Sequence, residues 1–408
     1  MNTQEIDKKL EELSEGADTA LYDIFKKIDK TSEILTKKVL DAFREERISA
    51  SHFDSTTGYG YDDKGRDSLD RIYAKVFGKE AAFVRHNLVS GTHALTVALF
   101  GILRPGDVML SVTGKPYDTL DEVIGLSGNP GDGSLKDFGV IYRETALGAD
   151  FTPELADKAV KMVYIQRSKG YLDRPTLSVA DINEITAKVH AIRPDVFVVV
   201  DNCYGEFTEE NEPDADLLVG SLIKNPGGGI AESGGYVAGS AKAVELVSYR
   251  FTCPGIGLEC GATLGQNRNM YKGLFFAPHI VAQALKTAHF AAYVFEKLGF
   301  DVYPSWQEKR YDIIQTVRMG EAEKLCAFCR GIQAGSPVDS FARPEPWAMP
   351  GYSDEVIMAA GTFTQGASLE LSADGPIRAP YIVFMQGGLT YESGKIGILS
   401  AAREVLGE

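Results

Sequence analysis

The sequence has few cysteines, and this limits the class of protein that it can encode. Five cysteines stand among 408 residues, at positions 203, 253, 260, 326 and 329. An odd, low number in a chain of this length is unlike the disulfide framework of a small secreted protein. Cys326-x-x-Cys329 has no second pair and no histidine nearby, and the six histidines show no metal-binding spacing, so we expect no metal site.

Long apolar segments and surplus basic charge are missing as well. No uncharged apolar run reaches the roughly 18 residues that a membrane span requires, and the first nine residues lack the apolar core of a signal peptide. The 42 Lys and Arg residues face 57 Asp and Glu residues, a net charge of −15. An acidic surface disfavours nucleic acid and anionic lipid. We therefore expect a soluble, cytoplasmic protein that binds neither nucleic acid nor membranes.

What the sequence does contain is ordinary globular composition with extra glycine. Hydrophobic residues make up 44% of the chain and charged residues 24%, which argues against extensive disorder. A length of 408 residues predicts two or three domains. The 42 glycines are about one residue in ten, which exceeds the usual frequency of about 7%. The excess indicates tight turns or close approaches between the backbone and a ligand.

Short apolar runs alternate with helical patterns between residues 51 and 265, the expected large domain. The expected strands are Ala81–Arg85, Val108–Val112, Val140–Tyr142, Met162–Gln166 and Val196–Asp201. The expected helices are Asp67–Phe77, Thr92–Leu103, Pro116–Leu126 and Ser178–Ile192. This alternation predicts an α/β fold, with a mixed, mostly parallel sheet and helices on both faces.

Two further regions flank the large domain. Residues 1–50 carry apolar side chains at helical spacing, and we expect a helical arm that packs on a partner, on a second domain or on its own domain. Residues 266–408 combine a long helix at Arg268–Leu298 with shorter elements, which predicts a smaller C-terminal α+β domain. The Pro- and aromatic-rich segment Ser336–Tyr352 is expected to be an ordered surface loop.

Candidate functional residues follow the expected strands, where parallel sheets bind ligands. Ser90, Gly91 and Thr92 precede an apolar helix, so backbone amides there can bind an anion, although Ser90 or Thr92 can simply cap the helix. Asp201 ends an apolar strand, where a carboxylate needs a cation or several hydrogen-bond donors. The acidic residues at 206–216 are expected to form a solvated loop.

Lys224 stands between an apolar run and the glycines Gly227–Gly229, which would leave room for a ligand against the backbone. A partly buried lysine has a lowered pKa and can attack a carbonyl, although most lysines are exposed surface residues. An anion cradle, Asp201 and a Lys 23 residues later match the phosphate, pyridine nitrogen and aldehyde of pyridoxal phosphate. Tyr117 is a candidate to lie over the ring, or else a half-buried core residue.

The combined pattern resembles the fold-type-I pyridoxal-phosphate enzymes. Within them it is similar to the cystathionine-γ-synthase-like group, and more closely to its methionine-γ-lyase-related, aluminium-resistance proteins. The motifs that carry this resemblance are Val89-Ser-Gly-Thr-His-Ala94, Val199-Val-Asp-Asn-Cys-Tyr-Gly-Glu-Phe207, Gly220-Ser-Leu-Ile-Lys-Asn-Pro-Gly-Gly-Gly229 and Phe384-Met-Gln-Gly-Gly-Leu-Thr-Tyr391.

The resemblance implies a role for each candidate residue. Lys224 would form the Schiff base with the cofactor and then move protons. Asp201 would pair with the pyridine nitrogen, and Tyr117 would stack on the ring. The phosphate would be bound by Ser90, Gly91 and Thr92 at the start of the helix, and by Ser221, which follows the apolar run before Lys224.

Two implied contacts depart from the family pattern. The family's Tyr-x-Arg, which reaches the phosphate of the neighbouring subunit, reads Tyr59-Gly-Tyr61 here. Tyr59 can therefore serve while the Arg is missing, and Arg66 is the candidate substitute. The substrate carboxylate would meet Arg378, whose neighbours differ from the Arg-Leu-Ser pattern of the lyases.

The resemblance implies an enzyme that uses pyridoxal phosphate on an amino acid, by β- or γ-elimination like a carbon–sulfur lyase. An aminotransferase on the same scaffold is one alternative, because fold does not fix reaction. A non-catalytic protein of this fold with a role in aluminium or metal stress is the other. The resemblance also implies a homodimer or homotetramer whose subunits share active sites.

Overall fold

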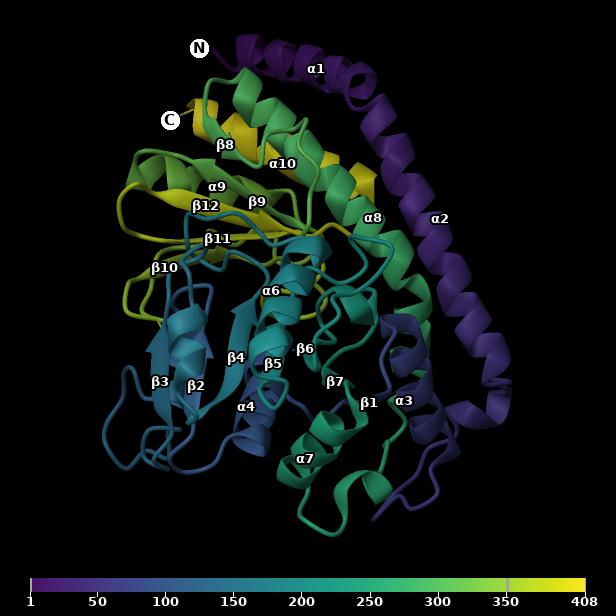
Figure 1. Ribbon diagram of the computed structural model, residues 1–408. Coiled ribbons are helices and arrows are strands. Elements are labelled where there is room, and N and C mark those ends of the chain that lie inside the picture. Colours follow the sequence, from purple (N-terminus) through teal and green to yellow (C-terminus); the bar gives the residue numbers. More distant parts are fainter. Residues whose placement is uncertain (1, 350–351, 408) are drawn as a thin grey trace.

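The computed structural model describes residues 2–349 and 352–407, and its larger sheet has seven strands in the order β1-β7-β6-β5-β4-β2-β3 (Figure 1). Strand β7 pairs antiparallel with β1 and β6, and the remaining pairs are parallel. The mixed, mostly parallel sheet is therefore confirmed. Its strands are β1 (Ala81–Arg85), β2 (Val108–Ser111), β3 (Ile141–Glu144), β4 (Val160–Gln166), β5 (Phe197–Asp201), β6 (Leu217–Ser221) and β7 (Gly235–Gly239).

Helices cover both faces of this sheet, as the sequence predicts. Val198 and Val200 of β5 belong to one apolar core and Val199 belongs to the other, so the central strand is apolar on both sides because both sides are buried. The first face packs on α3 (Lys64–Phe77), α6 (Val179–Ile192) and the start of α8 (Asn267–Lys297). The second packs on α4 (Gly91–Ile102) and α7 (Ala241–Phe251).

Several elements of the large domain differ from the sequence-based prediction, and α7 is a helix that was not expected. The helix expected at Pro116–Leu126 is a 3-10 turn, Asp118–Leu120, followed by the short α5 (Asp121–Ile124). It ends early because Gly125 adopts a left-handed conformation, with φ of 94°. Strand β7 was not predicted, because its short sequence, Gly-Tyr-Val-Ala-Gly, begins and ends with glycine.

The N-terminal arm packs on its own chain. It consists of α1 (Thr3–Ala20) and α2 (Tyr22–Glu45), and α2 runs alongside α8 (Figure 1). Leu10 and Leu21 enter the smaller apolar core, whereas Leu35 and Val39 enter the larger one. The arm thus spans both cores, as α8 does. Within the described parts of the chain, no helix has the length and apolar character needed to cross a membrane.

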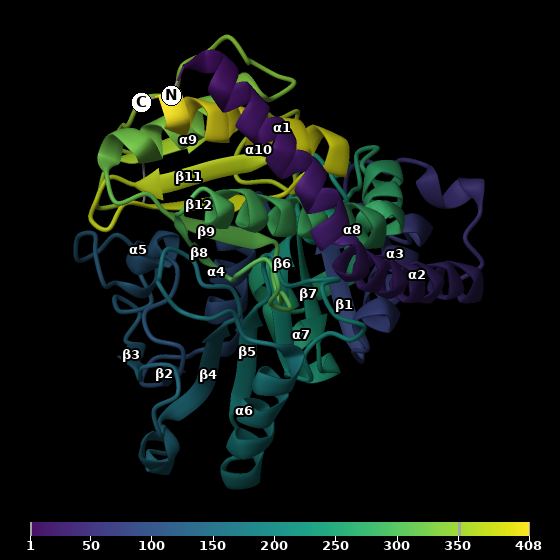
Figure 2. The ribbon, with the colours of Figure 1, turned by 90° about the horizontal axis from the view of Figure 1, so that it is seen from above.

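The smaller sheet is antiparallel, with the strand order β10-β11-β12-β9-β8. Helices α9 (Ala322–Ala334) and α10 (Tyr391–Gly407) cover one of its faces, and the other face is turned toward the large sheet (Figure 2). Its strands are β8 (Asp301–Tyr303), β9 (Ile314–Arg318), β10 (Val356–Ala359), β11 (Ser372–Pro376) and β12 (Ile382–Gln386). The domain boundaries after residues 50 and 265 stay a prediction. The strands of the larger sheet all precede residue 265, and those of the smaller sheet all follow it.

The Pro-rich segment Ser336–Tyr352 has no helix or strand within its described residues, and an isolated bridge between Trp347 and Val356 joins it to β10. Pro350 and Gly351 of this segment lie outside the described residues. Cys326 and Cys329 both lie buried on α9, so the Cys-x-x-Cys spacing is that of neighbouring residues on a helix.

Candidate functional site

The candidate site lies at the carboxyl edge of the large sheet, where β4, β5 and β6 end side by side. Gln166 pairs with Asp201, and Asp201 pairs with Val219, two residues before Ser221. The segments that follow these strands carry Arg167, Tyr204 and Lys224. The topology therefore brings Asp201, Ser221 and Lys224 to one edge, as the sequence predicts from the position of each after a strand.

Lys224 is half-buried and lies over an aromatic ring. Its Nζ is 3.9 Å from the centre of the Tyr204 ring, a cation–π contact. Burial alone lowers the pKa of Lys224, but Tyr204, Cys203 and Asp201 oppose this and raise the pKa above its ordinary value. The prediction of a lowered Lys224 pKa is therefore wrong for the chain without cofactor. Every charged or acidic neighbour that acts on Lys224 there favours its charged form.

Asp201 is a buried carboxylate that needs a positive partner. It is 6% exposed, and its Oδ1 accepts a hydrogen bond from the backbone N–H of Cys203 at 3.1 Å. Burial raises the pKa of Asp201, while Lys224 and that amide lower it. The adjacent Tyr164 hydroxyl is buried with no hydrogen-bond partner among the described residues. A protonated ring nitrogen placed here would supply a positive partner for Asp201 and would stabilise its carboxylate against the cost of burial.

The start of α4 offers the anion cradle. Ser90 caps this helix, because its side chain accepts a hydrogen bond from the His93 N–H at 3.0 Å. Gly91 and Thr92 are then the first helical residues, whose amides lack helical acceptors. Gly91 lies against Ser221: a Cβ on Gly91 would be 3.4 Å from the Ser221 Cβ.

The Ser221 side chain provides the test of whether an anion fits this cradle. Its Oγ is buried and has no hydrogen-bond partner among the described residues. An unpaired buried hydroxyl beside free helix amides is costly unless a ligand satisfies it. The donor set of hydroxyl and amides suits a phosphate, and Asp201 and Lys224 suit the ring nitrogen and aldehyde of pyridoxal phosphate. The residues present therefore fit this cofactor.

The glycines after Lys224 have a different role from the predicted one. A Cβ on Gly227 would collide with the carbonyl oxygen of Leu222, and a Cβ on Gly228 would collide with the carbonyl oxygen of Gly273 in α8. Gly228 is also left-handed, with φ of 56°. These glycines let the turn fold tightly and pack on α8, so the expectation that they leave space for a ligand is wrong.

Tyr117 lies in a cluster of tyrosines that the sequence did not group together. Its hydroxyl is 2.7 Å from that of Tyr352, and its ring packs edge-on against Tyr171 with the centroids 5.7 Å apart. Tyr204, under Lys224, and Tyr117 are close enough for the Tyr204 charge to act on the pKa of Tyr117. Tyr171 and Tyr352 come from loops without a recognisable motif, so no sequence signal marked them.

The Tyr59 loop is exposed, and Arg66 supports it from within. Tyr59 is 74% exposed and stacks on Tyr61. Arg66 is buried, and its Nη1 donates to the carbonyl oxygens of Gly60 at 2.7 Å and Gly261 at 3.1 Å. Arg66 is therefore committed to holding this loop, which disfavours it as a substitute for the missing Arg of the family motif.

Among the described residues, Arg378 makes its side-chain hydrogen bond and ion pair with Asp354 and none with the residues gathered around Lys224. It follows β11 in the turn to β12, is half-exposed at 44% for its side chain, and donates to Asp354 at 2.7 Å. Its assignment to the substrate carboxylate stays a prediction, and it requires Arg378 to leave Asp354. Asp374, four residues earlier and within β11, is buried near Lys224.

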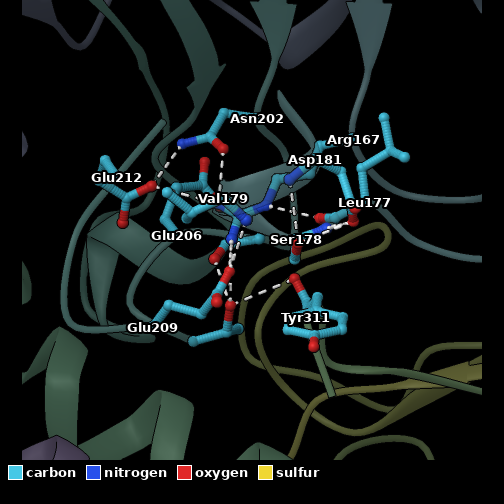
Figure 3. A network of polar contacts seen from close by, with 12 residues as sticks. Arg167, Leu177, Ser178, Val179, Asp181, Asn202, Glu206, Glu209, Glu212 and Tyr311 are labelled. Carbon is cyan, nitrogen blue, oxygen red and sulfur yellow. Dashed lines mark hydrogen bonds and ion pairs between the residues drawn. The ribbon is translucent and has the colours of Figure 1, made fainter. Parts of the chain in front are cut away.

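The acidic segment 206–216 is only partly solvated, because an arginine directly after β4 reaches into it (Figure 3). Arg167 is fully buried, and its guanidinium lies 3.1 Å from Glu209 and 3.2 Å from Glu212. It also donates to Asn202 Oδ1 at 2.8 Å. Glu206 is buried, whereas Glu210 and Asp214 are exposed. The prediction of a solvated acidic loop is therefore wrong for the residues that face Arg167.

This network fixes the segment that carries Cys203 and Tyr204. Asn202 donates to Glu212 at 2.9 Å and to the Tyr236 hydroxyl at 3.2 Å, and Tyr236 donates to Glu206 at 2.9 Å. Asn225, directly after Lys224, donates to the carbonyl oxygens of Tyr204 and Glu206. The charge cluster thus positions both the tyrosine under Lys224 and the turn that carries Lys224.

A second buried lysine near this edge provides a contrast with Lys224. Lys169 is 1% exposed, and its Nζ lies 4.4 Å from the centre of the Tyr303 ring. Burial lowers the pKa of Lys169 to about 8, with Asp312 partly opposing the shift. Lys169 therefore has the lowered pKa that the sequence suggests for Lys224, but it lacks the Asp201 and Ser221 surroundings.

Comparisons with known proteins show the family to which the chain belongs. The family model described as methionine gamma-lyase matches residues 10–406. The uncharacterized protein YnbB of Bacillus subtilis is 52% identical over 392 residues, which cover 94% of this chain and 93% of that protein. A crystal structure of a proposed cystathionine beta-lyase involved in aluminum resistance, from Listeria monocytogenes, is 50% identical with a TM-score of 0.94. That match covers 97% of this chain and all of the other.

More distant structures share the fold. The pyridoxal-5'-phosphate-dependent protein YhfS of Escherichia coli has a TM-score of 0.62 at 15% identity, over 93% of this chain and 97% of that one. At this identity the likeness supports the α/β architecture and the added small antiparallel sheet.

Replacing Arg167 tests the energetic role of the charge cluster. Arg167→Met should lower the free energy of unfolding by about 3–5 kcal/mol, because it leaves the buried carboxylate of Glu212 without its ion-pair partner. Arg143→Met is the matched control: Arg143 also meets two carboxylates, Glu154 and Asp157, but its side chain is 38% exposed. The control should cost less than about 1 kcal/mol. Equal losses in urea unfolding would contradict the assignment.

Glu206 predicts a specific dependence of stability on pH. Burial, and then Glu212, raise the pKa of Glu206 to about 8. Between its ordinary pKa and about 8, the unfolded chain releases a proton that the folded chain retains, so stability falls as pH rises, by up to about 1.4 kcal/mol per pH unit. Glu206→Gln should remove this part of the slope in urea unfolding at about pH 6 and about pH 8. The exposed neighbour Glu210→Gln should retain it; identical slopes in all three proteins would refute the assignment.

Proposed function

The chain belongs to the methionine gamma-lyase family and is a pyridoxal-phosphate-dependent lyase, and we propose that it breaks a carbon–sulfur bond of an amino acid by β- or γ-elimination. The observation that carries the proposal is the group at one sheet edge. There the buried Asp201, Lys224 and the Ser221 hydroxyl, which has no hydrogen-bond partner in the described parts of the chain, lie beside the first amides of α4.

Each residue has a separate task in the proposal. Ser221 and the amides of Gly91 and Thr92 bind the phosphate. Asp201 keeps the pyridine nitrogen protonated, so that the ring, when bound, withdraws electrons from the substrate Cα. Lys224 would hold the aldehyde of the cofactor, and its amine is the group that would take the proton from the substrate Cα and deliver it to a neighbouring position.

Tyr204 and Tyr117 complete the surroundings of the amine. The Lys224 Nζ lies 3.9 Å from the centre of the Tyr204 ring, and this contact restricts where the amine can move. We propose that Tyr117 covers the cofactor ring, since it belongs to the aromatic cluster that also contains Tyr171 and Tyr352. Together these rings limit access of water to the reacting carbon.

Removing the amine tests the central assignment. Wild-type protein with pyridoxal phosphate should show a visible absorption band, and Lys224→Ala should be colourless in that region and inactive. Lys169→Ala is the matched control, because it also removes a buried lysine near the same edge, and it should retain the band. Wild-type protein that takes up no cofactor, or an unchanged band in Lys224→Ala, would contradict the proposal.

The products of turnover separate elimination from its alternatives. Elimination releases a keto acid together with free ammonia, whereas transamination leaves the cofactor in its aminated form. A cystathionine beta-lyase activity is proposed for the Listeria monocytogenes relative, which supports sulfur-containing amino acids as the first compounds to assay. A non-catalytic protein would release neither product from any of them.

We also propose that the active site is shared between two subunits. Tyr59 and Tyr61 are 74% and 57% exposed and stack on each other, and the buried Arg66 holds their loop in place. A rigid, exposed aromatic loop is typical of a surface that meets a partner. In the proposed dimer, Tyr59 of each subunit reaches the phosphate bound by the other.

Mixing two defective variants tests this arrangement. Lys224→Ala lacks the amine and Tyr59→Ala lacks the partner contact, so each alone should have low activity. When both are unfolded and refolded together, about a quarter of the sites should regain both residues, because a mixed dimer has one intact site. Activity no greater than the sum of the separate variants, or a fully active monomer in sedimentation, would contradict a shared site.

A further inference from the structure

Asp374 lies on the face of the small sheet that is turned toward the large domain. In β11, Ala373 packs into the core beneath α9 and α10. Alternate residues of a strand point to opposite faces, so Asp374 points the other way, beside Phe384 with which it pairs on β12. The Phe384 ring packs on Tyr171 of the large domain with the centroids 4.9 Å apart. The carboxylate is therefore directed at the junction of the two domains.

The surroundings of Asp374 are those of the candidate site. It is 4% exposed, and its Oδ1 has no hydrogen-bond partner among the described residues. Its charge acts on the pKa values of the site tyrosines, and Lys224 is the cation that acts on Asp374. Burial raises the pKa of Asp374 to about 6, with Tyr171, Gln386 and Lys224 opposing the shift.

Positive side chains on this part of the small domain are already paired elsewhere. Arg318 of β9 lies on the same face as Phe384, but it is 44% exposed and meets Asp173 at 2.8 Å. Arg378, at the end of the hairpin, meets Asp354. The charge that the small domain presents toward Lys224 is therefore negative, where the family resemblance suggested a positive one.

A buried carboxylate without a cation is unfavourable. In the chain alone, Lys224 supplies positive charge to both Asp201 and Asp374. If Lys224 holds the cofactor, as the proposed function requires, its charge is engaged there and Asp374 lacks a partner. A positive group on the substrate would restore the balance, and the tyrosine faces beside it would favour a cation further.

We propose that Asp374 makes this site selective for amino acids whose side chain ends in an ammonium group. This inference rests on the proposed lyase function and specifies its substrate class. Asp374 binds the distal ammonium by a charge-assisted hydrogen bond, and Tyr171 and Tyr352 line the same position. The positive end thus lies against the small domain while the α-amino group is at Lys224.

Three cysteine derivatives that share an S–CH2–CH2 stem and differ in the group at its end test this selectivity on the enzyme loaded with cofactor. S-(2-aminoethyl)-L-cysteine ends in an ammonium, S-propyl-L-cysteine in a methyl and S-(2-carboxyethyl)-L-cysteine in a carboxylate. For wild-type enzyme, kcat/KM for the aminoethyl compound should exceed that for the propyl compound at least tenfold, and the carboxyethyl compound should be the poorest. Equal values, or a preference for the propyl or carboxyethyl compound, would overturn the inference.

Asp374→Asn keeps the shape of the side chain and removes its charge. It should reduce the preference for the aminoethyl over the propyl compound, as a ratio of kcat/KM values, to about threefold or less. Asp301→Asn is the control: Asp301 is an exposed residue on β8 of the same sheet, and its replacement should keep the full preference. An unchanged preference in Asp374→Asn would also overturn the inference. If Asp374→Asn does not fold, the wild-type ratios decide.

Failure of the proposed function gives a different result. If the loaded enzyme cleaves none of the three compounds, their dissociation constants are measured by calorimetry. Tenfold tighter binding of the aminoethyl compound would support the role of Asp374 while refuting β-elimination of these compounds. Equal affinities, or no binding of any of them, would overturn the inference. Cleavage of all three at equal rates would support the lyase and refute the role of Asp374.

Discussion

A negative charge buried at the end of a parallel sheet must be met by a positive one, and the candidate site is organised around this constraint. Asp201 ends β5 with little contact with solvent and one backbone donor. In the chain alone the compensating charge comes from Lys224, which lies over Tyr204. A cofactor with a protonated ring nitrogen could take over that compensation, which leaves the amine to react.

The same constraint shapes the residues behind the site. Glu209 and Glu212 are held by the fully buried Arg167, and Glu206 depends on hydrogen bonds from Tyr236. These contacts fix the segment between β5 and the turn that carries Lys224, because Asn225 binds the carbonyl oxygens of Tyr204 and Glu206. The charge cluster thus determines where Tyr204 supports the amine.

Much of the large domain could be predicted from the sequence, because its strands are apolar runs placed between amphipathic helices. The position of Asp201, Ser221 and Lys224 after such strands was enough to place them at one edge. The strands β7 and β11 were missed, since Gly235–Gly239 and Ser372–Pro376 lack apolar runs, and they become strands through pairing with distant segments.

Residues that act through long-range contacts were harder to predict. Arg167 precedes the acidic segment by about 40 residues in the sequence, and only the sheet pairing brings the two together. Asp374 was missed because the family resemblance directed attention to Arg378, four residues away, which strand alternation and the hairpin turn place elsewhere. Glycine has several roles, so Gly227–Gly229 could not be assigned to packing until α8 was seen against them.

The most direct test of the central claim is to identify the lysine that holds the cofactor. The protein loaded with pyridoxal phosphate is reduced with borohydride, digested and analysed by mass spectrometry. The account predicts one modified residue, Lys224, because the phosphate cradle and Asp201 fix the aldehyde beside it. Modification of Lys169, whose pKa of about 8 makes it the more readily deprotonated amine, would show that basicity and not the surrounding site selects the lysine, and would contradict the account.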